Sequence, residues 1–406
     1  MRRATTIAVL IFFISANFPG SAALGYVSDT TVPLGGGCPQ ADRWNLSLAS
    51  PLNRRWSTSL SPAHTTVITV AASGSAAQLN EIEQVVSASF GAWAGVAGTT
   101  FNTAASSGLI APLGHTSDPN SCTNDAETNV DGLNTVCFNQ ASTGFASGVL
   151  AFTRTITANA PGVSVGVSGP AAFAGQILDA DTLFRNDGQG TFATPGALAT
   201  PQGAGAYDLE SLLTHELGHW FGLSHSAVWR AIMFPFAPPP GSFLGDRPTA
   251  QVPDGPLADD DRTGIRVSYA DPNDAVYIGT ISGRILPASP FALATIPSPS
   301  TGRSVTGIFG AHVVAVDADT GSVIAGTLAG WSCDAANPPT TFDGSYELDR
   351  LAVGHNYKIY AEPLDGVVGP GDFTQPLAEL CGMGATGECT TPAVNTNFGV
   401  RPQPGP

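Results

Sequence analysis

The stretch of the chain that decides the fold reads His215-Glu216-Leu217-Gly218-His219-Trp220-Phe221-Gly222-Leu223-Ser224-His225. On a helix, His215 and His219 lie one turn apart on the same face, so a ring nitrogen of each can reach one metal ion. Gly222 can adopt the positive φ that ends a helix sharply, and the chain can then carry His225 to the same ion as a third ligand. The pattern predicts a zinc site with one coordination position left for water.

Glu216 follows the first of these histidines and lies off the axis of the ligands. From there its carboxylate can reach a metal-bound water without becoming a ligand, as a general base must. A histidine pair with this spacing can arise by chance on any amphipathic helix. The added glycine and third histidine, at fixed distances along the chain, argue against coincidence because histidine is rare in ordinary composition.

Eight residues after His225, Met233 stands in the short apolar segment Ala231-Ile232-Met233-Phe234-Pro235. A methionine side chain is soft and adaptable, so it can form a floor beneath three imidazoles. Pro235 then supplies the turn that supports the site. The alternative interpretation is that Met233 is an ordinary core residue.

The histidine motif and the methionine turn together are the signature of metzincin metalloproteases. The sequence resembles the matrixin branch of that group over roughly Arg43 to Tyr269, through the approach to the motif at 207–211, Phe90, Trp93 and Val96 of a first long helix, Thr99-Thr100-Phe101, and a last helix at 257–265. The resemblance implies an α+β fold, a metzincin-type zinc protease domain with a mixed twisted sheet and long helices. It also implies an endopeptidase in which a zinc-activated water attacks the peptide bond and Glu216 is the general base.

The resemblance extends to details around the site. Residues 178–187 resemble the edge strand that borders the substrate cleft, to which an extended peptide could add. Their aspartates are candidates for structural Ca²⁺, with solvated turn residues as the alternative. The second, structural zinc of animal matrixins is expected to be absent, because only His64 and His115 remain in the catalytic region. Pro235-Phe236-Ala237 lacks the tyrosine that often follows, so the depth of the S1′ pocket does not carry over.

The pair Asp260-Asp261 opens the expected last helix. Acidic residues at a helix N-terminus are favoured by the macrodipole alone. The resemblance adds a second possible role, hydrogen bonding to the methionine turn.

The N-terminus indicates export. Arg2-Arg3, an apolar run from Ile7 to Ile14 and the small residues Ser21-Ala22-Ala23 are typical of a secretory signal cleaved near Ala23. A membrane anchor is the alternative, but the run is short for a span and no later stretch reaches about 20 apolar residues. The net charge of −16, with one lysine, argues against nucleic acid or anionic membrane as a partner. We expect a secreted, extracellular monomer that acts on a protein or peptide substrate.

Six cysteines in an exported chain indicate disulfides. Cys122 could pair with Cys137, and Cys381 with Cys389, which leaves Cys38 and Cys333 to pair or to stay free. A latency role for Cys38 as a fourth zinc ligand is a further alternative, because matrixins use a propeptide cysteine in this way. The context around Cys38 lacks the flanking Arg-Cys-Gly pattern, which favours a plain disulfide.

Four parts are expected along the chain: a signal peptide at 1–23, an N-terminal segment at 24–42, the matrixin-like domain at 43–271, and a C-terminal all-β sandwich with a tail at 272–406. Short strands separated by Gly and Asp turns indicate the sandwich. Its Asp343-Gly344-Ser345-Tyr346 turn resembles the transthyretin-like, carboxypeptidase-regulatory-like domain, and His312 and His355 are expected to be ordinary surface or core residues. The alternative function is a secreted binding or adhesion protein that uses this sandwich, with the protease fold as scaffold.

Within the catalytic part, alternating apolar residues predict strands at 67–71, 148–157 and 175–184. Helical spacing predicts a helix at 78–94, and Asp208 is the expected N-cap of the helix that carries the motif. The polar stretch 103–136 is expected to be loop.

Overall fold

The computed structural model describes residues 28–31, 33–34, 40–47, 51–57, 67–103, 108–117, 130–140, 145–162, 164–165, 169–245, 255–286, 304–305, 307–308, 310–329 and 341–362. The predicted signal peptide, His64 and every cysteine except Cys137 lie outside these residues. Cys137 is disulfide-bonded. Its pairing with Cys122 therefore stays a prediction.

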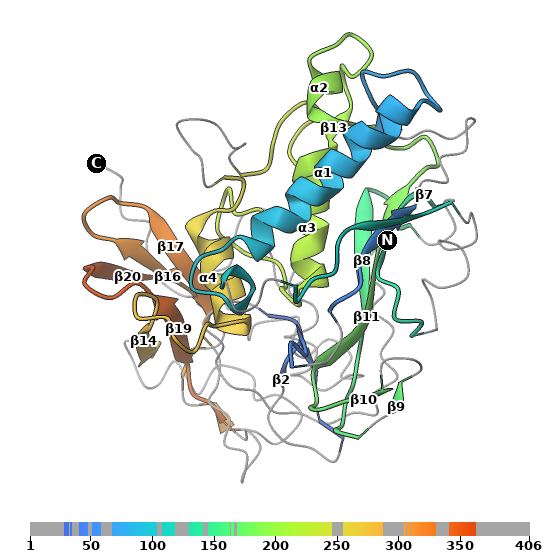
Figure 1. Cartoon of the computed structure of the whole chain (residues 1–406). Coiled ribbons are helices and arrows are strands. Elements are labelled where there is room, and N and C mark those ends of the chain that lie inside the picture. The colour runs from blue at the N-terminus through green and yellow to red at the C-terminus, as the bar shows by residue number, and fades with distance from the viewer. Residues whose placement is uncertain are drawn as a thin grey trace, which may run out of the picture.

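The part of the chain predicted to be catalytic, up to residue 271 and called the catalytic part below, is built on a mixed sheet of six strands (Figure 1). Five follow one another in the order β3-β11-β7-β4-β6, and β8 pairs with β11. All partners are parallel except β8, which runs antiparallel to β11. The strands are β3 (Arg43–Trp44), β4 (Arg55–Ser57), β6 (Gly114–Thr116), β7 (Thr135–Gln140), β8 (Ala151–Thr157) and β11 (Gln176–Arg185).

Of the two long helices, α3 packs on strands β8 and β11 of this sheet, and α1 packs on α3 (Figure 1). Helix α1 (Ala76–Ala94) begins at the N-cap Ser75, whose hydroxyl accepts from the backbone N–H of Gln78. Its buried apolar residues recur every three or four positions, as a one-sided helix requires. Helix α3 (Leu209–Trp220) is almost wholly buried and begins at Asp208, which accepts from the N–H of Ser211. The predicted N-cap is confirmed, and the 78–94 helix begins two residues earlier than predicted.

The predicted edge strand at 178–187 is wrong. Every residue of β11 is buried, and the strand has partners on both sides, β3 and β7 on one and β8 on the other. Among the described residues, no further strand pairs with the outer side of β8, so β8 is the open edge of the sheet. The physical reason is that residues 176–185 are mainly apolar or internally bonded and suit a central position, since strands buried on both faces lose their polar alternation.

Two smaller differences between the predicted and the observed strands arise because strands pair with partners far away in sequence. The predicted strand at 67–71 shortens to β5 (Val67–Ile68), and the stretch expected to be loop at 103–136 contains β6 and the start of β7. Both β6 and β7 pair with β4, far away in sequence, so local composition gave no signal. The remaining short elements here are β1 (Thr30–Thr31), β2 (Gln40–Ala41), η1 (Thr100–Asn102), β9 (Ser164–Val165), β10 (Gly169–Pro170), β12 (Phe192–Ala193), α2 (Pro195–Leu198) and β13 (Tyr207–Asp208).

The catalytic core lies between the sheet and the helices and is rich in aromatic rings. The ring of Trp220 in α3 packs against Phe90 of α1 and against Trp44 of β3, with centroids 5.3 Å and 4.7 Å apart. The Trp93 indole N–H donates to the carbonyl oxygen of Thr214, which fixes α1 against α3. Buried aromatic pairs of this kind each contribute roughly 0.5–1.5 kcal/mol beyond their burial. These contacts fix the position of α1 relative to α3.

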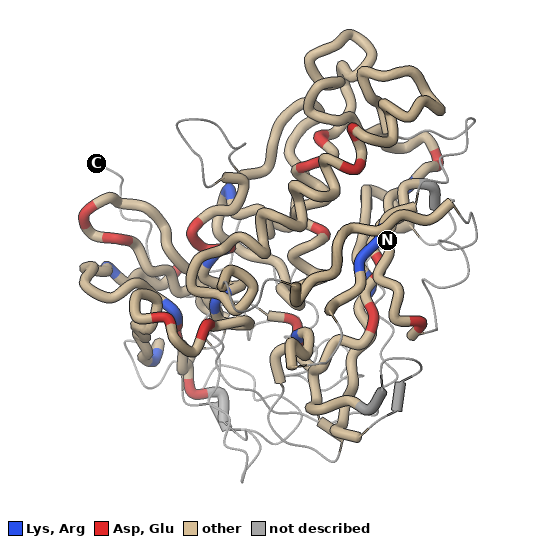
Figure 2. Tube along the Cα trace, viewed as in Figure 1, with Lys and Arg blue, Asp and Glu red and all other residues tan. Residues whose placement is uncertain are grey.

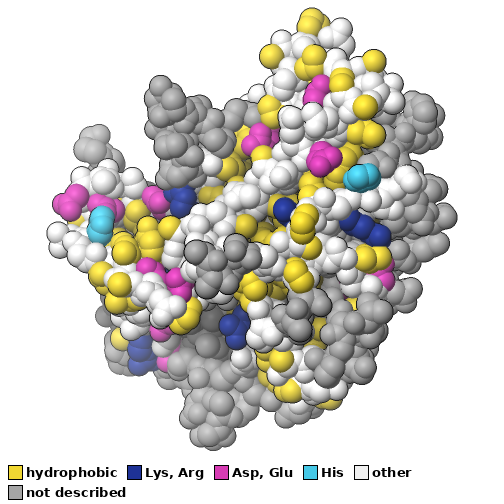
Figure 3. Space-filling model, viewed as in Figure 1, with side chains coloured by type: hydrophobic (Ala, Val, Ile, Leu, Met, Phe, Trp, Pro, Cys, Tyr) yellow, Lys and Arg dark blue, Asp and Glu magenta, His cyan; other side chains and the backbone are white. Residues whose placement is uncertain are grey.

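Helix α4 (Asp259–Ser268) joins the catalytic part to a C-terminal β region (Figure 1). This region, the strands β14–β20, forms three small sheets with a core cluster of its own. Its strands are β14 (Gly279–Arg284), β15 (Ser304–Val305), β16 (His312–Asp317), β17 (Val323–Leu328), β18 (Thr341–Phe342), β19 (Ser345–Leu351) and β20 (Tyr357–Glu362). Acidic residues are spread over both parts of the chain (Figures 2 and 3). Among the described residues, no helix has the length and apolar character needed to cross a membrane.

Candidate metal centre

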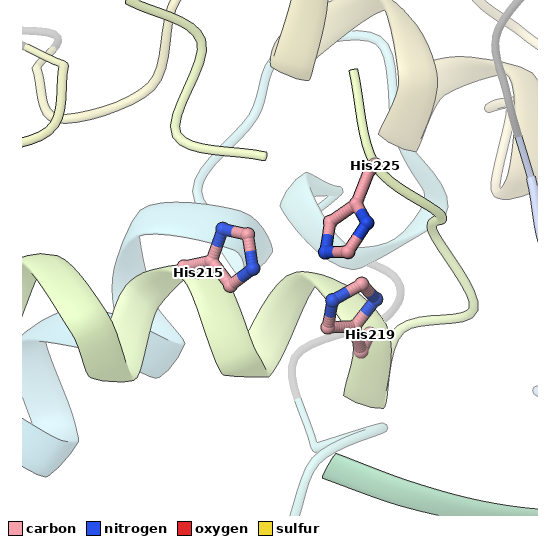
Figure 4. A group of neighbouring side chains, drawn as sticks. All are labelled: His215, His219 and His225. Atoms are coloured by element: carbon pink, nitrogen blue, oxygen red, sulfur yellow. The ribbon is translucent and has the colours of Figure 1, made fainter. Parts of the chain in front are cut away.

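The structure brings the three predicted histidines together (Figure 4). His215 and His219 project from α3, and His225 comes from the loop that follows it. One ligand atom from each ring lies within 4.8 Å of the others, and the ring centroids are 4.9–5.4 Å apart. Within the described part of the chain, this is the single group of three or more His, Cys, Asp or Glu side chains arranged to hold a metal ion.

In two of these rings, those of His215 and His219, Nδ1 is hydrogen-bonded to a backbone carbonyl oxygen. Nδ1 of His215 lies 2.6 Å from the carbonyl oxygen of Ile232, and Nδ1 of His219 lies 2.7 Å from that of Leu223. Because a carbonyl can only accept, each Nδ1 carries the proton and each Nε2 keeps its lone pair. This is the tautomer that a metal ligand needs, and such outer contacts orient the rings.

Burial also keeps these imidazoles neutral. It lowers the pKa of His215 to about 3 and that of His219 well below its usual value, and the neighbouring histidines add to the shift. Neutral rings can bind a cation at any pH in the physiological range. One buried and two half-buried imidazoles, of which His215 and His219 are neutral and oriented by backbone carbonyls, fit Zn²⁺, which favours nitrogen ligands in a catalytic site.

Glu216 is buried beside the ligands and is held by Thr153 of β8. The Thr153 hydroxyl lies 3.1 Å from the Glu216 carboxylate and 2.8 Å from the hydroxyl of Thr182. It lies 2.8 Å from the backbone carbonyl of Glu216 as well, so its one proton is directed to Glu216 while Thr182 can donate to it. Burial raises the pKa of Glu216 to about 8, and the Thr153 hydrogen bonds oppose that shift. Sequence reasoning missed Thr153, because it comes from a distant strand and carries no local motif.

Two glycines of the motif are required by close packing. A Cβ on Gly218 would lie 2.1 Å from the sulfur of Met233, so the methionine turn packs directly under the helix between His215 and His219. Gly222 has φ +88° and ends α3 as predicted; a Cβ there would lie 2.0 Å from the carbonyl oxygen of Asp42. Met233 is fully buried, as both a floor to the site and an ordinary core residue would be, and the closeness of its sulfur to Gly218 favours the first interpretation.

Asp261 supports the methionine turn. Its carboxylate accepts from the backbone N–H groups of Ile232 at 2.7 Å and Met233 at 3.1 Å, and from that of Ala258 at 2.8 Å. Burial raises its pKa to about 6, and these hydrogen bonds limit the rise. Of the two roles considered for this residue, the structure shows both: Asp261 caps α4 and fixes the turn beneath the histidines. Asp260 has different partners, described below.

The N-terminal segment 28–44 also reaches the site, which the sequence did not indicate. Asp29 donates its backbone N–H to the carbonyl oxygen of Gly222 at 3.1 Å, and its side chain is hydrogen-bonded to Ser224, next to His225. The Trp44 indole N–H donates to the carbonyl oxygen of Trp220 at 2.9 Å, and the hydroxyl of Tyr269 accepts from the Trp44 backbone N–H. The segment thus pins the loop that carries the third histidine.

An apolar pocket lies beside the methionine turn, lined among others by Trp229, Phe234, Phe236, Pro238 and Phe243. Trp229 is 70% exposed, so part of an aromatic side chain is open to solvent. Pro235 is half-buried between the two phenylalanines of this wall. The predicted absence of a tyrosine two residues after Pro235 leaves Ala237 there, exposed.

The acidic residues of 179–187 have protein partners. The Asp181 carboxylate accepts from the N–H of Thr135, and Asp187 forms an ion pair with Arg185. The expected calcium site there stays a prediction. His115 is exposed in β6, His312 contacts Glu362 and His355 contacts Asp317, so these histidines lie in ordinary structural positions.

An imidazole trio on a helix and its following loop, a neighbouring carboxylate and a methionine turn on an α+β fold define a metzincin-type metalloprotease site. The sequence pattern of the matrixin family matches residues 59–270, just over half of the chain, and the chain belongs to that family. It is also similar to Metalloendoproteinase 1 of Glycine max, with 47% identity over 64 residues, or 16% of this chain and 17% of that protein. The match thus spans less than a fifth of the relative's length. The predicted resemblance to matrixins is confirmed.

Proposed function

We propose that this chain is a secreted zinc metalloendopeptidase. The observation that carries the proposal is the cluster of His215, His219 and His225 beside the buried carboxylate of Glu216 in a matrixin-family chain. When bound, zinc acts as a Lewis acid that makes water acidic enough to be a nucleophile near neutral pH and polarises a carbonyl.

The residues around the ion have separate tasks. Glu216 takes the proton from the attacking water and passes it to the leaving amine, and the Thr153 hydrogen bond keeps its carboxylate directed into the site. No side chain forms a covalent bond to the substrate in this scheme. The open side of β8 offers backbone groups to which an extended peptide can add as a further strand, and the apolar pocket next to Met233 suits an apolar substrate side chain.

The substitution Glu216→Ala tests the general base. We expect the variant to keep stoichiometric zinc, because all three ligands remain, while peptide cleavage falls by at least about 100-fold. Glu210→Ala, on the same helix and only half-buried, is the matched control and should keep wild-type activity. Full activity of the Glu216 variant would refute the assignment.

Metal removal separates this proposal from the alternative of a binding or adhesion protein. Cleavage of unfolded casein should stop after incubation with a zinc chelator and return when zinc is restored. A protein that uses the C-terminal β region for adhesion would show no chelator-sensitive cleavage at all. Profiling the cleavage sites on a denatured proteome would then define the substrate preference.

The proposal includes the division of the chain. Residues 1–23 would be removed on export, 24–42 precede the catalytic domain at 43–271, and 272–406 contain a transthyretin-like β-sandwich with a tail. The exported enzyme would act as a monomer, with disulfides that suit an oxidising compartment. The three small sheets around their own core cluster support a separate C-terminal fold.

A further inference from the structure

Asp260 lies between the metal centre and the C-terminal β region. Its side chain is completely buried, one position before the residue that supports the methionine turn. One carboxylate oxygen accepts from the Ser226 hydroxyl at 2.6 Å, and the other accepts from the backbone N–H of Gly326 in β17 at 2.6 Å. Ser226 follows His225 directly. The Asp260 carboxylate therefore joins two distant segments: the loop after α3 that carries His225 (the third-histidine loop), and strand β17, in which Gly326 lies 100 residues after Ser226.

The strand β17 packs directly on this loop. A Cβ on Gly326 would lie 3.0 Å from the Val228 side chain and 2.6 Å from Nε2 of the buried His312. Nearby, the Thr263 hydroxyl of α4 lies 3.1 Å from the carbonyl oxygen of Ile324, and Leu328 of the same strand belongs to the core cluster of the catalytic part. The glycine thus permits a close approach that a side chain would prevent.

Three hydrogen bonds hold Ser226 at the far end of the loop that carries His225. The Ser226 backbone N–H donates to the carbonyl oxygen of Met233, and the Ser226 hydroxyl accepts from the N–H of Val228 while it donates to Asp260. Without the Asp260 carboxylate the buried Ser226 hydroxyl loses its acceptor, and an unsatisfied buried donor is destabilising. Asp29 holds the start of this loop, whereas its far end at Ser226 is held by Asp260, which is itself hydrogen-bonded to Gly326.

We propose that the C-terminal β region completes the metal centre: Gly326 of β17 fixes the Asp260 carboxylate, which in turn fixes the loop that presents His225. Asp260 is a positioning residue, since its two carboxylate oxygens are bonded to Ser226 and Gly326 and it acts on the site through Ser226. The inference rests on the proposed function, because it takes His225 as a zinc ligand. It predicts that a change in β17, far from the ligands in sequence, weakens zinc binding.

The first arm of the test changes the carboxylate in the full-length protein. Asp260→Asn keeps the shape of the side chain but leaves one oxygen for two donors, so we expect zinc transfer to a chromophoric chelator to become about 10-fold faster. For peptide cleavage, kcat should fall while KM changes little, because the substrate contacts are intact. Asp259→Asn, next to it on α4 and bonded to Arg262 at the surface, is the matched control and should release zinc at the wild-type rate.

The second arm changes the strand. Gly326→Val drives a side chain against Val228 and His312, so β17 should move away from Asp260 and zinc release should accelerate about 10- to 100-fold. Val323→Ala, at the exposed start of the same strand, is its control. Circular dichroism and tryptophan fluorescence establish that each variant is folded.

The outcomes are distinguishable. Wild-type zinc release from folded Asp260→Asn overturns the inference, whether or not Gly326→Val folds, and leaves the proposed function standing. A wild-type protein that takes up no stoichiometric zinc overturns the proposed function instead. Faster release from both variants, with both controls unchanged, supports the inference.

Discussion

At the scale of single residues, the site depends on glycines as much as on its ligands. Gly222 is held at φ +88° and leaves 2.0 Å between a hypothetical Cβ and the carbonyl oxygen of Asp42, whereas Gly188 has a similar φ of +79° with no atom near such a Cβ. A residue with a Cβ would be strained at both positions because of the positive φ, but only at Gly222 would its Cβ also clash with another atom.

We predict that Gly222→Ala destabilises the protein far more than Gly188→Ala. Alanine at a left-handed position costs about 1–2 kcal/mol by itself, which is the whole effect expected at Gly188. The clash with a buried backbone carbonyl at Gly222 should bring the loss to about 4 kcal/mol or more. Equilibrium unfolding in urea measures both changes. Equal losses for the two variants would contradict the steric argument.

The residues that could be predicted from sequence are those whose roles depend on local spacing. His215, His219, His225, Glu216, Gly222 and Met233 stand at fixed offsets within 19 residues, and the structure places them as expected. Thr153 and Trp44 touch the same site from distant strands, and nothing in their local sequence marks them. Asp261 is intermediate: its place at a helix start is visible in the sequence, but its bonds to the methionine turn need the tertiary fold.

At the scale of elements, the position of a strand within the sheet depends on its pairing partners, which the periodicity of its sequence does not reveal. Residues 178–187 contain the aspartates and apolar residues of a plausible edge, yet β11 is central because β3, β7 and β8 all pair with it. An alternating pattern gives the faces of a strand and does not give its neighbours. The helices α1 and α3 were predicted well, since their caps and apolar spacing are local.

The N-terminal segment is an element that the family match at 59–270 leaves out. It contains two buried carboxylates: Asp29 is hydrogen-bonded to Ser224 in the loop that carries His225, and Asp42 accepts from the Thr31 hydroxyl. Burial raises the pKa of Asp29 to about 7, opposed by its hydrogen bond to Ser224, and burial together with the Asp29 charge raises the pKa of Asp42 well above its usual value. Between about pH 4 and pH 7, the Asp29 carboxyl therefore keeps its proton in the folded protein and loses it in the unfolded chain.

This proton uptake predicts a pH dependence with a definite sign. The folded pKa of Asp29, about 7, lies above the usual aspartate value of 3.8, so its contribution to stability is present below pH 4 and is lost as pH rises toward 7. Asp29→Asn removes that titration. Relative to wild type, the variant should gain on the order of 3 kcal/mol of unfolding free energy between pH 4.5 and about pH 8.

Urea unfolding of both proteins in the presence of a zinc chelator at the two pH values measures this difference, so that a change in zinc affinity does not enter the comparison. Asp319→Asn, in an exposed turn of the C-terminal β region, controls for the loss of a carboxylate as such. A stability difference between Asp29→Asn and wild type that stays constant with pH would show that Asp29 does not titrate in this range.

At the scale of the whole molecule, α4 belongs to both halves of the chain. Ile265 packs in the catalytic core, while Thr263 and Asp260 bond to β17. The Arg266 side chain donates to the carbonyl oxygen of Ala97 and lies over the Tyr277 ring at 3.5 Å. Domains joined by a flexible linker usually move independently; a helix buried on both sides removes that freedom.

We therefore predict that the full-length protein unfolds in one cooperative transition. Separate melting of the C-terminal β region would leave Asp260, with both oxygens bonded in the folded state, buried without the Gly326 donor, and would expose the side of α4 that β17 covers. Unfolding of the C-terminal β region alone would therefore also destabilise the catalytic part, and we expect no such half-unfolded intermediate to be populated. Scanning calorimetry should give one peak, with the calorimetric and van't Hoff enthalpies equal. Gly326→Val should split the peak in two, because it breaks the contact that couples the halves; two peaks already present in the wild type would rule the coupling out.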